Sequence, residues 1–178
     1  MARAGTRMTG NKFFYDGGAR MILLQLRERA FAAFQHGRPA EAERLCVEIL
    51  DLSSEDVAGH SLLGHLRFGQ QRYREALASY DRALASEPDD PDLLYIRANA
   101  LQAMGQAHEA LAGYERALAR QPTFPAAWNN RANILLEEGR LEEALAATIE
   151  CWRRRLASPR SGSTVPICWC ASAAGPRH

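Results

Sequence analysis

The chain has 178 residues, of which 47% are hydrophobic and 24% charged, which suits one domain of ordinary size. Its 22 basic and 21 acidic residues leave a net charge of +1, and this argues against a protein whose main task is to neutralise phosphates. We therefore expect no nucleic-acid partner. No apolar run approaches the roughly 18 residues that a membrane span needs, so we expect no membrane partner either.

Residues 1–22 are expected to form a poorly ordered N-terminal lead. The apolar stretch "MILLQL" at its end is too short for a secretory signal core and runs directly into Arg27, Glu28 and Arg29. A cytoplasmic location is therefore expected. The four cysteines have no regular spacing and do not indicate a disulfide framework.

A 34-residue repeat follows this lead. The stretch "RANALQAMGQAHEALA" begins at Arg97 and its counterpart "RANILLEEGRLEEALA" begins at Arg131. Two further steps of the same length toward the N-terminus reach Leu63 and Arg29. Such a period indicates stacked structural units. The sequence divides without insertions into units 23–56, 57–90, 91–124 and 125–156.

Small residues recur at two positions of each unit, counted from 1 to 34. Position 8 holds Ala30, Gly64, Ala98 and Ala132. Position 20 holds Ala42, Ala76, Ala110 and Ala144. Positions 1–14 and 17–30 carry helix formers with apolar residues at helical spacing. Each unit is therefore predicted to be a pair of helices whose backbones approach closely at the small residues.

Turn residues separate the predicted helices. Glycine at position 15 suits the left-handed residue that ends a helix. It is present as Gly37, Gly105 and Gly139. Pro88 and Pro122 at position 32 end the second helix, because proline interrupts the hydrogen-bond ladder. Asp90 is the expected N-cap of the next helix, with Pro91 at its first position.

The period, the small residues, Tyr80 and Tyr114 at position 24 and the prolines at position 32 resemble the tetratricopeptide repeat family. The resemblance covers residues 23 to about 156. It implies an all-α, right-handed α-solenoid of four helix-turn-helix hairpins. The last unit has the signature tryptophan, Trp128, but carries Thr148 and Cys151 where tyrosine and alanine are usual.

In that family the first helix of each unit lines a concave groove that binds an extended peptide or a partner's helix. The resemblance thus implies a protein- or peptide-binding adaptor or scaffold. The candidate groove residues at positions 5, 9 and 12 are Arg27, Phe31, Phe34, Ser61, His65, Phe68, Tyr95, Asn99, Gln102, Asn129 and Asn133. The phenylalanines would anchor a partner, and the amides would pair with a peptide backbone. The alternative is that both sets only pack the solenoid.

A carboxylate clamp of Lys and Arg, which some members of the family use, is not expected, because Arg27 is the only cation at these positions. The amides instead resemble the repeat arms of bacterial O-GlcNAc-transferase-type proteins. The alternative function is therefore a truncated or frameshifted substrate-recruiting arm of a longer protein, without catalytic activity. Arg29, Arg97 and Arg131 recur at position 7, and we favour structural ion pairs over an anionic ligand.

No catalytic motif is present, neither a P-loop nor G-x-S-x-G nor H-E-x-x-H, so no enzyme activity and no cofactor are expected. Cys168 and Cys170 are separated by one residue and lack a second pair, so no metal site is expected. Residues 157–178 are predicted to be an irregular tail. Because no polar helix follows the last unit, we expect self-association through an uncapped C-terminal helix.

Overall fold

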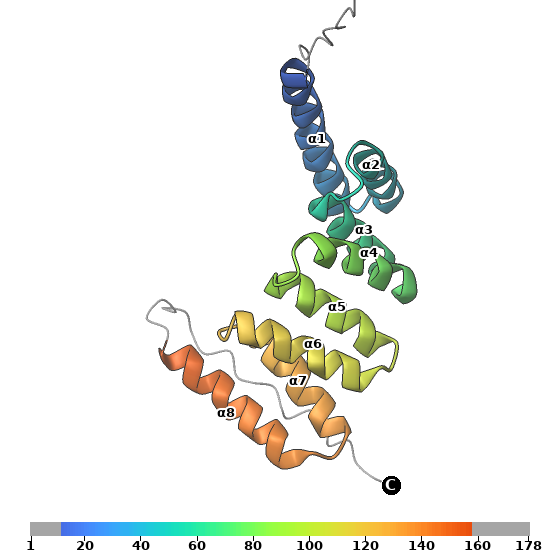
Figure 1. The fold of residues 1–178 in the computed structure, drawn as a ribbon. Helices are drawn as coiled ribbons and strands as arrows, with labels where there is room; N and C mark the ends of the chain where they lie inside the picture. Colours follow the sequence, from blue (N-terminus) through green and yellow to red (C-terminus); the bar gives the residue numbers. More distant parts are fainter. Residues whose placement is uncertain (1–11, 158–178) are drawn as a thin grey trace, which may run out of the picture.

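A computed structural model describes residues 12–157, and every regular element in that range is a helix. The helices are α1 (Lys12–Gln35), α2 (Pro39–Leu52), α3 (Val57–Gly69), α4 (Tyr73–Ser86), α5 (Pro91–Ala103), α6 (Ala107–Arg120), α7 (Pro125–Glu137) and α8 (Leu141–Ala157). They stack in chain order from one end of the molecule to the other (Figure 1). The predicted all-α solenoid of helical hairpins is confirmed.

The hairpins follow the 34-residue register. The helices α3, α5 and α7 begin at the first residues of the second, third and fourth units, and every second helix begins at position 17. Each helix packs mainly on the helix before it and the helix after it in the chain. The core is accordingly a row of clusters between neighbouring helices, as expected for a repeat protein.

The turns have the predicted chemistry. The position-15 glycines Gly37, Gly105 and Gly139 have φ angles of 67°, 75° and 74°, in the left-handed region. Gln71 adopts the same conformation, with φ of 62°, although an L side chain is strained there. The predicted N-cap is confirmed, since the carboxylate of Asp90 accepts a hydrogen bond from the Leu93 amide at 2.8 Å.

The two helices of a hairpin touch at the predicted small residues. The alanines at position 20 and the residues at position 8 are all buried. In the second hairpin the fit is closest, because a Cβ added to Gly64 would lie 2.3 Å from Cε1 of Tyr80. The rings of Tyr80 and Tyr114 are almost fully buried, with 1% and 0% exposed surface. Position 24 therefore fills the space that position 8 leaves.

At the N-terminus the structure differs from the expectation. Because α1 begins at Lys12, residues 12–22 are helical rather than part of a poorly ordered lead. Leu26 and Ala30 anchor the helix in the first core cluster, and a formed helix extends at little cost per residue. The first proline of the chain is Pro39, so nothing upstream stops the ladder. Residues 1–11 and the predicted tail from residue 158 lie outside the described residues.

Candidate functional site

A hollow of about 710 Å³ lies where α1, α3 and α5 meet. Four of the predicted groove residues line it: Arg27 from α1, Ser61 and His65 from α3, and Tyr95 from α5. The rest of its wall consists of Val57, Ala58, Glu87, Asp90, Asp92, Leu93, Ile96 and Phe124. The first helices of three successive hairpins therefore bring position 5 to one common surface.

Arg27 does not stand free in this hollow. Its Nε donates a hydrogen bond to the Asp56 carboxylate at 3.0 Å, and its terminal nitrogen pairs with the same oxygen. The Asp56 side chain is fully buried, and its other oxygen accepts from the Gly59 amide at 2.7 Å as the N-cap of α3. Arg27 thus compensates a buried carboxylate, which removes most of its attraction for an anionic ligand.

The carboxylates on the rim of the hollow outnumber the cations. Glu87 and Asp92 are exposed, and their carboxylates make no hydrogen bond within the described part of the chain, while Asp90 uses one oxygen for the cap of α5. With Arg27 already paired to Asp56, the lining carries a surplus of negative charge. Such a surface attracts a cationic group and repels an acidic one.

His65 projects into the same hollow with a defined tautomer. Its Nδ1 lies 2.8 Å from the Ser61 carbonyl oxygen, which can only accept, so Nδ1 carries the proton and donates. In the tautomer with its proton on Nδ1, the ring has Nε2 as an acceptor. The edge-to-face contact with Tyr80, at 5.7 Å between ring centroids, fixes the ring plane.

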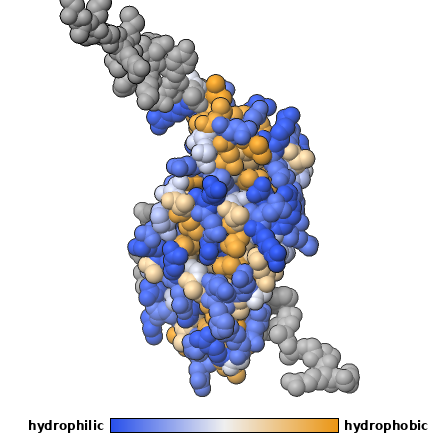
Figure 2. All heavy atoms as spheres, turned by 45° about the vertical axis from the view of Figure 1, so that its right-hand side comes forward, coloured by the Kyte–Doolittle hydropathy of each residue, from blue (hydrophilic) through white to orange (hydrophobic). Residues whose placement is uncertain are grey.

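The phenylalanines of the predicted groove fall into two groups. Phe31 and Phe34 on α1 are 53% and 40% exposed, which is unusual for such large apolar side chains. Phe68 is only partly exposed, because it packs against the cluster of Ala76, Tyr80 and Ala100. Hydrophobic residues gather over the N-terminal end of the solenoid, whereas its flanks are hydrophilic (Figure 2).

A hydrogen-bond network organises the amides between the third and fourth hairpins. The Tyr114 hydroxyl lies 2.7 Å from Asn99 Oδ1 and 2.7 Å from Gln102 Oε1. Asn130 Nδ2 donates to Asn99 Oδ1 at 2.8 Å and contacts the hydroxyls of Tyr95 and Tyr114 at 3.3 Å each. The oxygen of Asn99 is therefore occupied, whereas its NH₂ group makes no hydrogen bond with another described residue.

The other two predicted amides are open. Asn129 and Asn133 on α7 are exposed, and their side-chain amides have no hydrogen-bond partner among residues 12–157. Burial raises the pKa of Tyr114 to about 12, so its hydroxyl stays protonated and keeps the network intact near neutral pH. This end of the groove thus presents amide groups of which the inner ones are held in fixed orientation.

Asn130 is the residue that the sequence reasoning missed. It occupies position 6, which was not among the lining positions. Its side chain nevertheless links α7 to Tyr95 and Asn99 of α5. The adjacent pair of asparagines in "WNNRAN" was the available signal, because two polar residues in sequence point to different sides of a helix.

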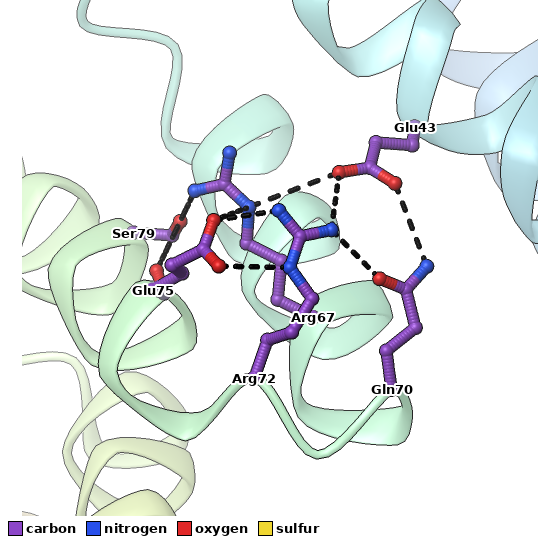
Figure 3. A network of polar contacts seen from close by, with 6 residues as sticks. All are labelled: Glu43, Arg67, Gln70, Arg72, Glu75 and Ser79. Atoms are coloured by element: carbon purple, nitrogen blue, oxygen red, sulfur yellow. Dashed lines mark hydrogen bonds and ion pairs between the residues drawn. The ribbon is translucent and has the colours of Figure 1, made fainter.

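A second polar network ties α2, α3 and α4 together (Figure 3). It consists of Glu43, Arg67, Gln70, Arg72, Glu75 and Ser79. Arg72 donates to Glu75 at 2.6 Å and 2.8 Å and to Glu43 at 3.1 Å, and this hydrogen bonding lowers the pKa of the Glu75 carboxyl. A smaller hollow of about 400 Å³ borders Arg72 and Glu75. Since these charges already satisfy one another, we assign no ligand to it.

The repeated arginines at position 7 form ion pairs across the joints between hairpins. Arg97 Nε lies 2.6 Å from Asp81 Oδ1, and a terminal guanidinium nitrogen of Arg131 lies 3.0 Å from Glu115 Oε1. Both acids occupy position 25 of the preceding unit. The interpretation as structural ion pairs is supported for these two arginines, whereas Arg29 is exposed and has no such partner in the described chain.

The described residues contain no group of three or more His, Cys, Asp or Glu side chains that could hold a metal ion. Cys168 and Cys170, considered above for metal binding, lie outside residues 12–157. None of the eight described helices combines the length and the apolar character that crossing a membrane requires.

Three family models, each described as tetratricopeptide repeat, match residues 33–100, 91–124 and 114–146. Together they extend across all four hairpins. The chain is a tetratricopeptide repeat (TPR) protein. A search of curated proteins gave no significant match.

Solved structures of other TPR proteins are similar in fold. MamA matches with a TM-score of 0.72 at 18% identity, over 76% of this chain and 79% of that one. The first TPR domain of Spaghetti (RPAP3), bound to the HSP90 peptide SRMEEVD, matches with a TM-score of 0.64 at 21% identity, over 66% and 93%. An O-GlcNAc transferase from Thermobaculum terrenum matches with a TM-score of 0.63 at 25% identity, over 66% of this chain but 22% of that one.

Proposed function

We propose that this TPR protein is an adaptor or scaffold that binds a peptide segment of a partner protein along the first helices of its hairpins. The observation that carries the proposal is the hollow of about 710 Å³, where Arg27, Ser61, His65 and Tyr95 converge from three helices. Its volume lies in the range of ligand-binding clefts. The RPAP3 domain, similar in fold and bound to a peptide, supports a peptide as the class of ligand.

The two ends of the groove suit different parts of such a segment. Phe31 and Phe34 offer exposed aromatic surface, onto which apolar side chains of the segment would pack. Asn129 and Asn133 offer free donors and acceptors that pair with the backbone of an extended peptide. The segment therefore binds with its apolar residues toward α1 and its extended backbone along α7.

The charge of the hollow selects the side chain that enters it. Glu87, Asp90 and Asp92 face a single arginine, and that arginine is paired with the buried Asp56. A lysine or arginine of the segment would contact these carboxylates and donate to Nε2 of His65. A peptide such as SRMEEVD, which carries three carboxylates in its side chains, is a poor fit. The proposal thus specifies a basic residue next to apolar ones.

The alternative function is a substrate-recruiting arm of a longer protein. The likeness to the Thermobaculum terrenum O-GlcNAc transferase at 25% identity and the exposed amides of α7 favour it. Such an arm would hold many sequences through their backbones. The two functions differ in selectivity, and neither assigns catalytic activity, a cofactor or a metal to the groove.

The test is selection of a random peptide library on the immobilised full chain, followed by fluorescence anisotropy with the enriched peptide. We expect sequences with a lysine or arginine close to large apolar residues. Phe31→Ala and Asp92→Asn should each weaken binding by roughly fivefold or more. Leu52→Ala is the matched control, because Leu52 is 56% exposed at the end of α2, away from the hollow.

Two results would overturn the adaptor proposal. One is enrichment of acidic sequences, which contradicts the charge of the hollow. The other is a peptide whose affinity is the same for Phe31→Ala as for Leu52→Ala. Retention of many unrelated peptides, lost in the double variant Asn129→Ala and Asn133→Ala, would support the recruiting arm instead.

A further inference from the structure

The outer face of α8 carries a row of large apolar side chains in the open. Leu141, Leu145, Ile149 and Trp152 are 63%, 62%, 49% and 48% exposed. Their spacing of four, four and three residues places them on one stripe of the helix. We call this row the α8 stripe. The helix lies at the end of the stack, with no described helix beyond it (Figure 1).

The preceding hairpin shows what such a stripe normally does. Leu111 and Leu118 on α6 hold the same repeat positions as Leu145 and Trp152, and both are only 7% exposed. They belong to the cluster that includes Ala127 and Ile134 of α7. The α8 stripe is therefore a surface built for burial against another helix.

The ion pairs between successive hairpins indicate that α1 of a second copy does not suit the α8 stripe. Position 25 of one unit pairs with position 7 of the next, as Asp81 with Arg97 and Glu115 with Arg131. A second copy stacked head to tail would set its exposed Arg29, at position 7, against Ile149, at position 25. Arg29 would lack the acidic partner that Arg97 and Arg131 have at their joints, so the position-7 contacts do not favour continuation of the stack by a second copy.

The charges of α8 instead suit an antiparallel arrangement of two copies. Glu142, near the start of the helix, makes no ion pair among the described residues, and Arg153 lies near the end. The Arg153 guanidinium is 72% exposed, so donors beyond its 2.8 Å pair with Glu150 remain open. Antiparallel packing brings the acidic end of one helix to the basic end of the other and also opposes the two helix dipoles.

The apolar and charged residues of α8 are arranged symmetrically about a single point of the helix. The pairs Leu141 with Trp152 and Leu145 with Ile149 both have midpoints at Ala147 or within half a residue of it. Glu142 and Arg153 are centred within half a residue of the same position, and both flank the stripe on the same side. A two-fold axis perpendicular to α8 at Ala147 therefore matches apolar with apolar and acid with base.

We propose that two copies of this chain associate through their α8 stripes around this two-fold axis. The pairing is isologous, so it closes at a dimer and does not grow into a filament. It leaves the groove on α1, α3 and α5 of each copy free. The inference is independent of the function proposed for that groove.

Sedimentation velocity of the full chain over a wide concentration range tests the proposal. We expect a monomer–dimer equilibrium whose limiting mass is twice the 19.8 kDa of the chain. Leu145→Glu should raise the dissociation constant at least about tenfold, because it sets a charge in the apolar contact. Ala112→Glu is the matched control, since Ala112 is exposed on α6 and the change of charge is the same. Circular dichroism confirms that both variants keep their helix content.

Charge reversal tests the antiparallel geometry. Glu142→Arg and Arg153→Glu should each weaken the dimer, because each sets like charges together at two symmetric places. The double variant should recover most of the lost affinity. A monomer at every concentration, assemblies larger than a dimer, a dimer insensitive to Leu145→Glu, or a double variant as weak as the singles would each overturn the proposal.

Discussion

The two buried tyrosines at position 24 offer a matched test of the amide network. Tyr80 and Tyr114 are buried to the same degree, but their hydroxyls differ in surroundings. The Tyr114 hydroxyl lies 2.7 Å from the oxygens of Asn99 and Gln102. The Tyr80 hydroxyl makes no hydrogen bond with another described residue. Replacing each tyrosine by phenylalanine keeps the ring in place and removes only the hydroxyl.

The expected cost follows from the geometry of the network. A hydroxyl has one proton, so Tyr114 donates to one of the two oxygens at a time. One such hydrogen bond contributes about 1 kcal/mol, and the contact from Asn130 Nδ2 at 3.3 Å adds a smaller amount. Tyr114→Phe should therefore lower the free energy of unfolding by about 1–2 kcal/mol. Tyr80→Phe should change it by less than about 0.5 kcal/mol.

Urea denaturation followed by far-UV circular dichroism at neutral pH measures both values. The slope of the free energy against urea should be the same in the two variants, because neither alters the surface exposed on unfolding. The reasoning would be refuted if both substitutions cost the same, or if Tyr80→Phe cost more. Either result would mean that ring packing, and not the hydrogen-bond network, governs position 24.

Two further predictions concern the tight fit at Gly64 and the chemistry of Cys46. Gly64→Ala should lower the free energy of unfolding by about 1–3 kcal/mol, because the new Cβ would lie 2.3 Å from the Tyr80 ring. Urea titration should show that Gly64→Ala costs less when Tyr80→Leu is also present. Additive costs of the two substitutions would contradict the clash. Burial, followed by the Glu43 and Asp56 carboxylates, raises the pKa of the Cys46 thiol to about 11. The pKa of this thiol in the folded state exceeds its unfolded value of about 8.5. The free energy of unfolding therefore keeps the contribution of the Cys46 thiol below about pH 8.5 and loses it as the pH rises toward 11. Iodoacetamide labelling with peptide mass analysis at pH 8 should modify Cys46 only after unfolding, and equal labelling of folded and unfolded protein would contradict its burial.

The hairpins could be predicted because their determinants are local in sequence. A glycine such as Gly105, with φ of 75°, ends one helix within the turn itself. Asp90 caps α5 through an amide three residues away. The N-terminus was read less well. Residues 12–22 were expected to belong to a poorly ordered lead, yet α1 includes them because the rest of the helix is held by α2.

The site was harder to predict because its polar contacts join residues that are far apart in sequence. Arg27 meets Asp56 from 29 residues away, and Asn130 meets Asn99 from 31 residues away. The sequence places Arg27 at a lining position but does not show that a buried carboxylate occupies it. The position of a residue within the 34-residue unit thus indicates whether its side chain is expected to face the groove. It does not indicate whether that side chain is already satisfied by a neighbouring unit.

The ion pairs between position 7 and position 25 bear on register more than on stability. Arg97 and Asp81 are partly exposed, and a surface pair of this kind contributes at most about 1 kcal/mol. A register that sets such an arginine opposite a residue without a carboxylate loses the ion pair and is disfavoured to that extent. At the first joint the corresponding residues are Val47, which is 47% exposed, and the buried Leu63, so this joint has no such ion pair. Ile149 at position 25 of the last hairpin offers no carboxylate to Arg29 of a second copy, whereas α8 of a second copy brings the apolar side chains of its own stripe.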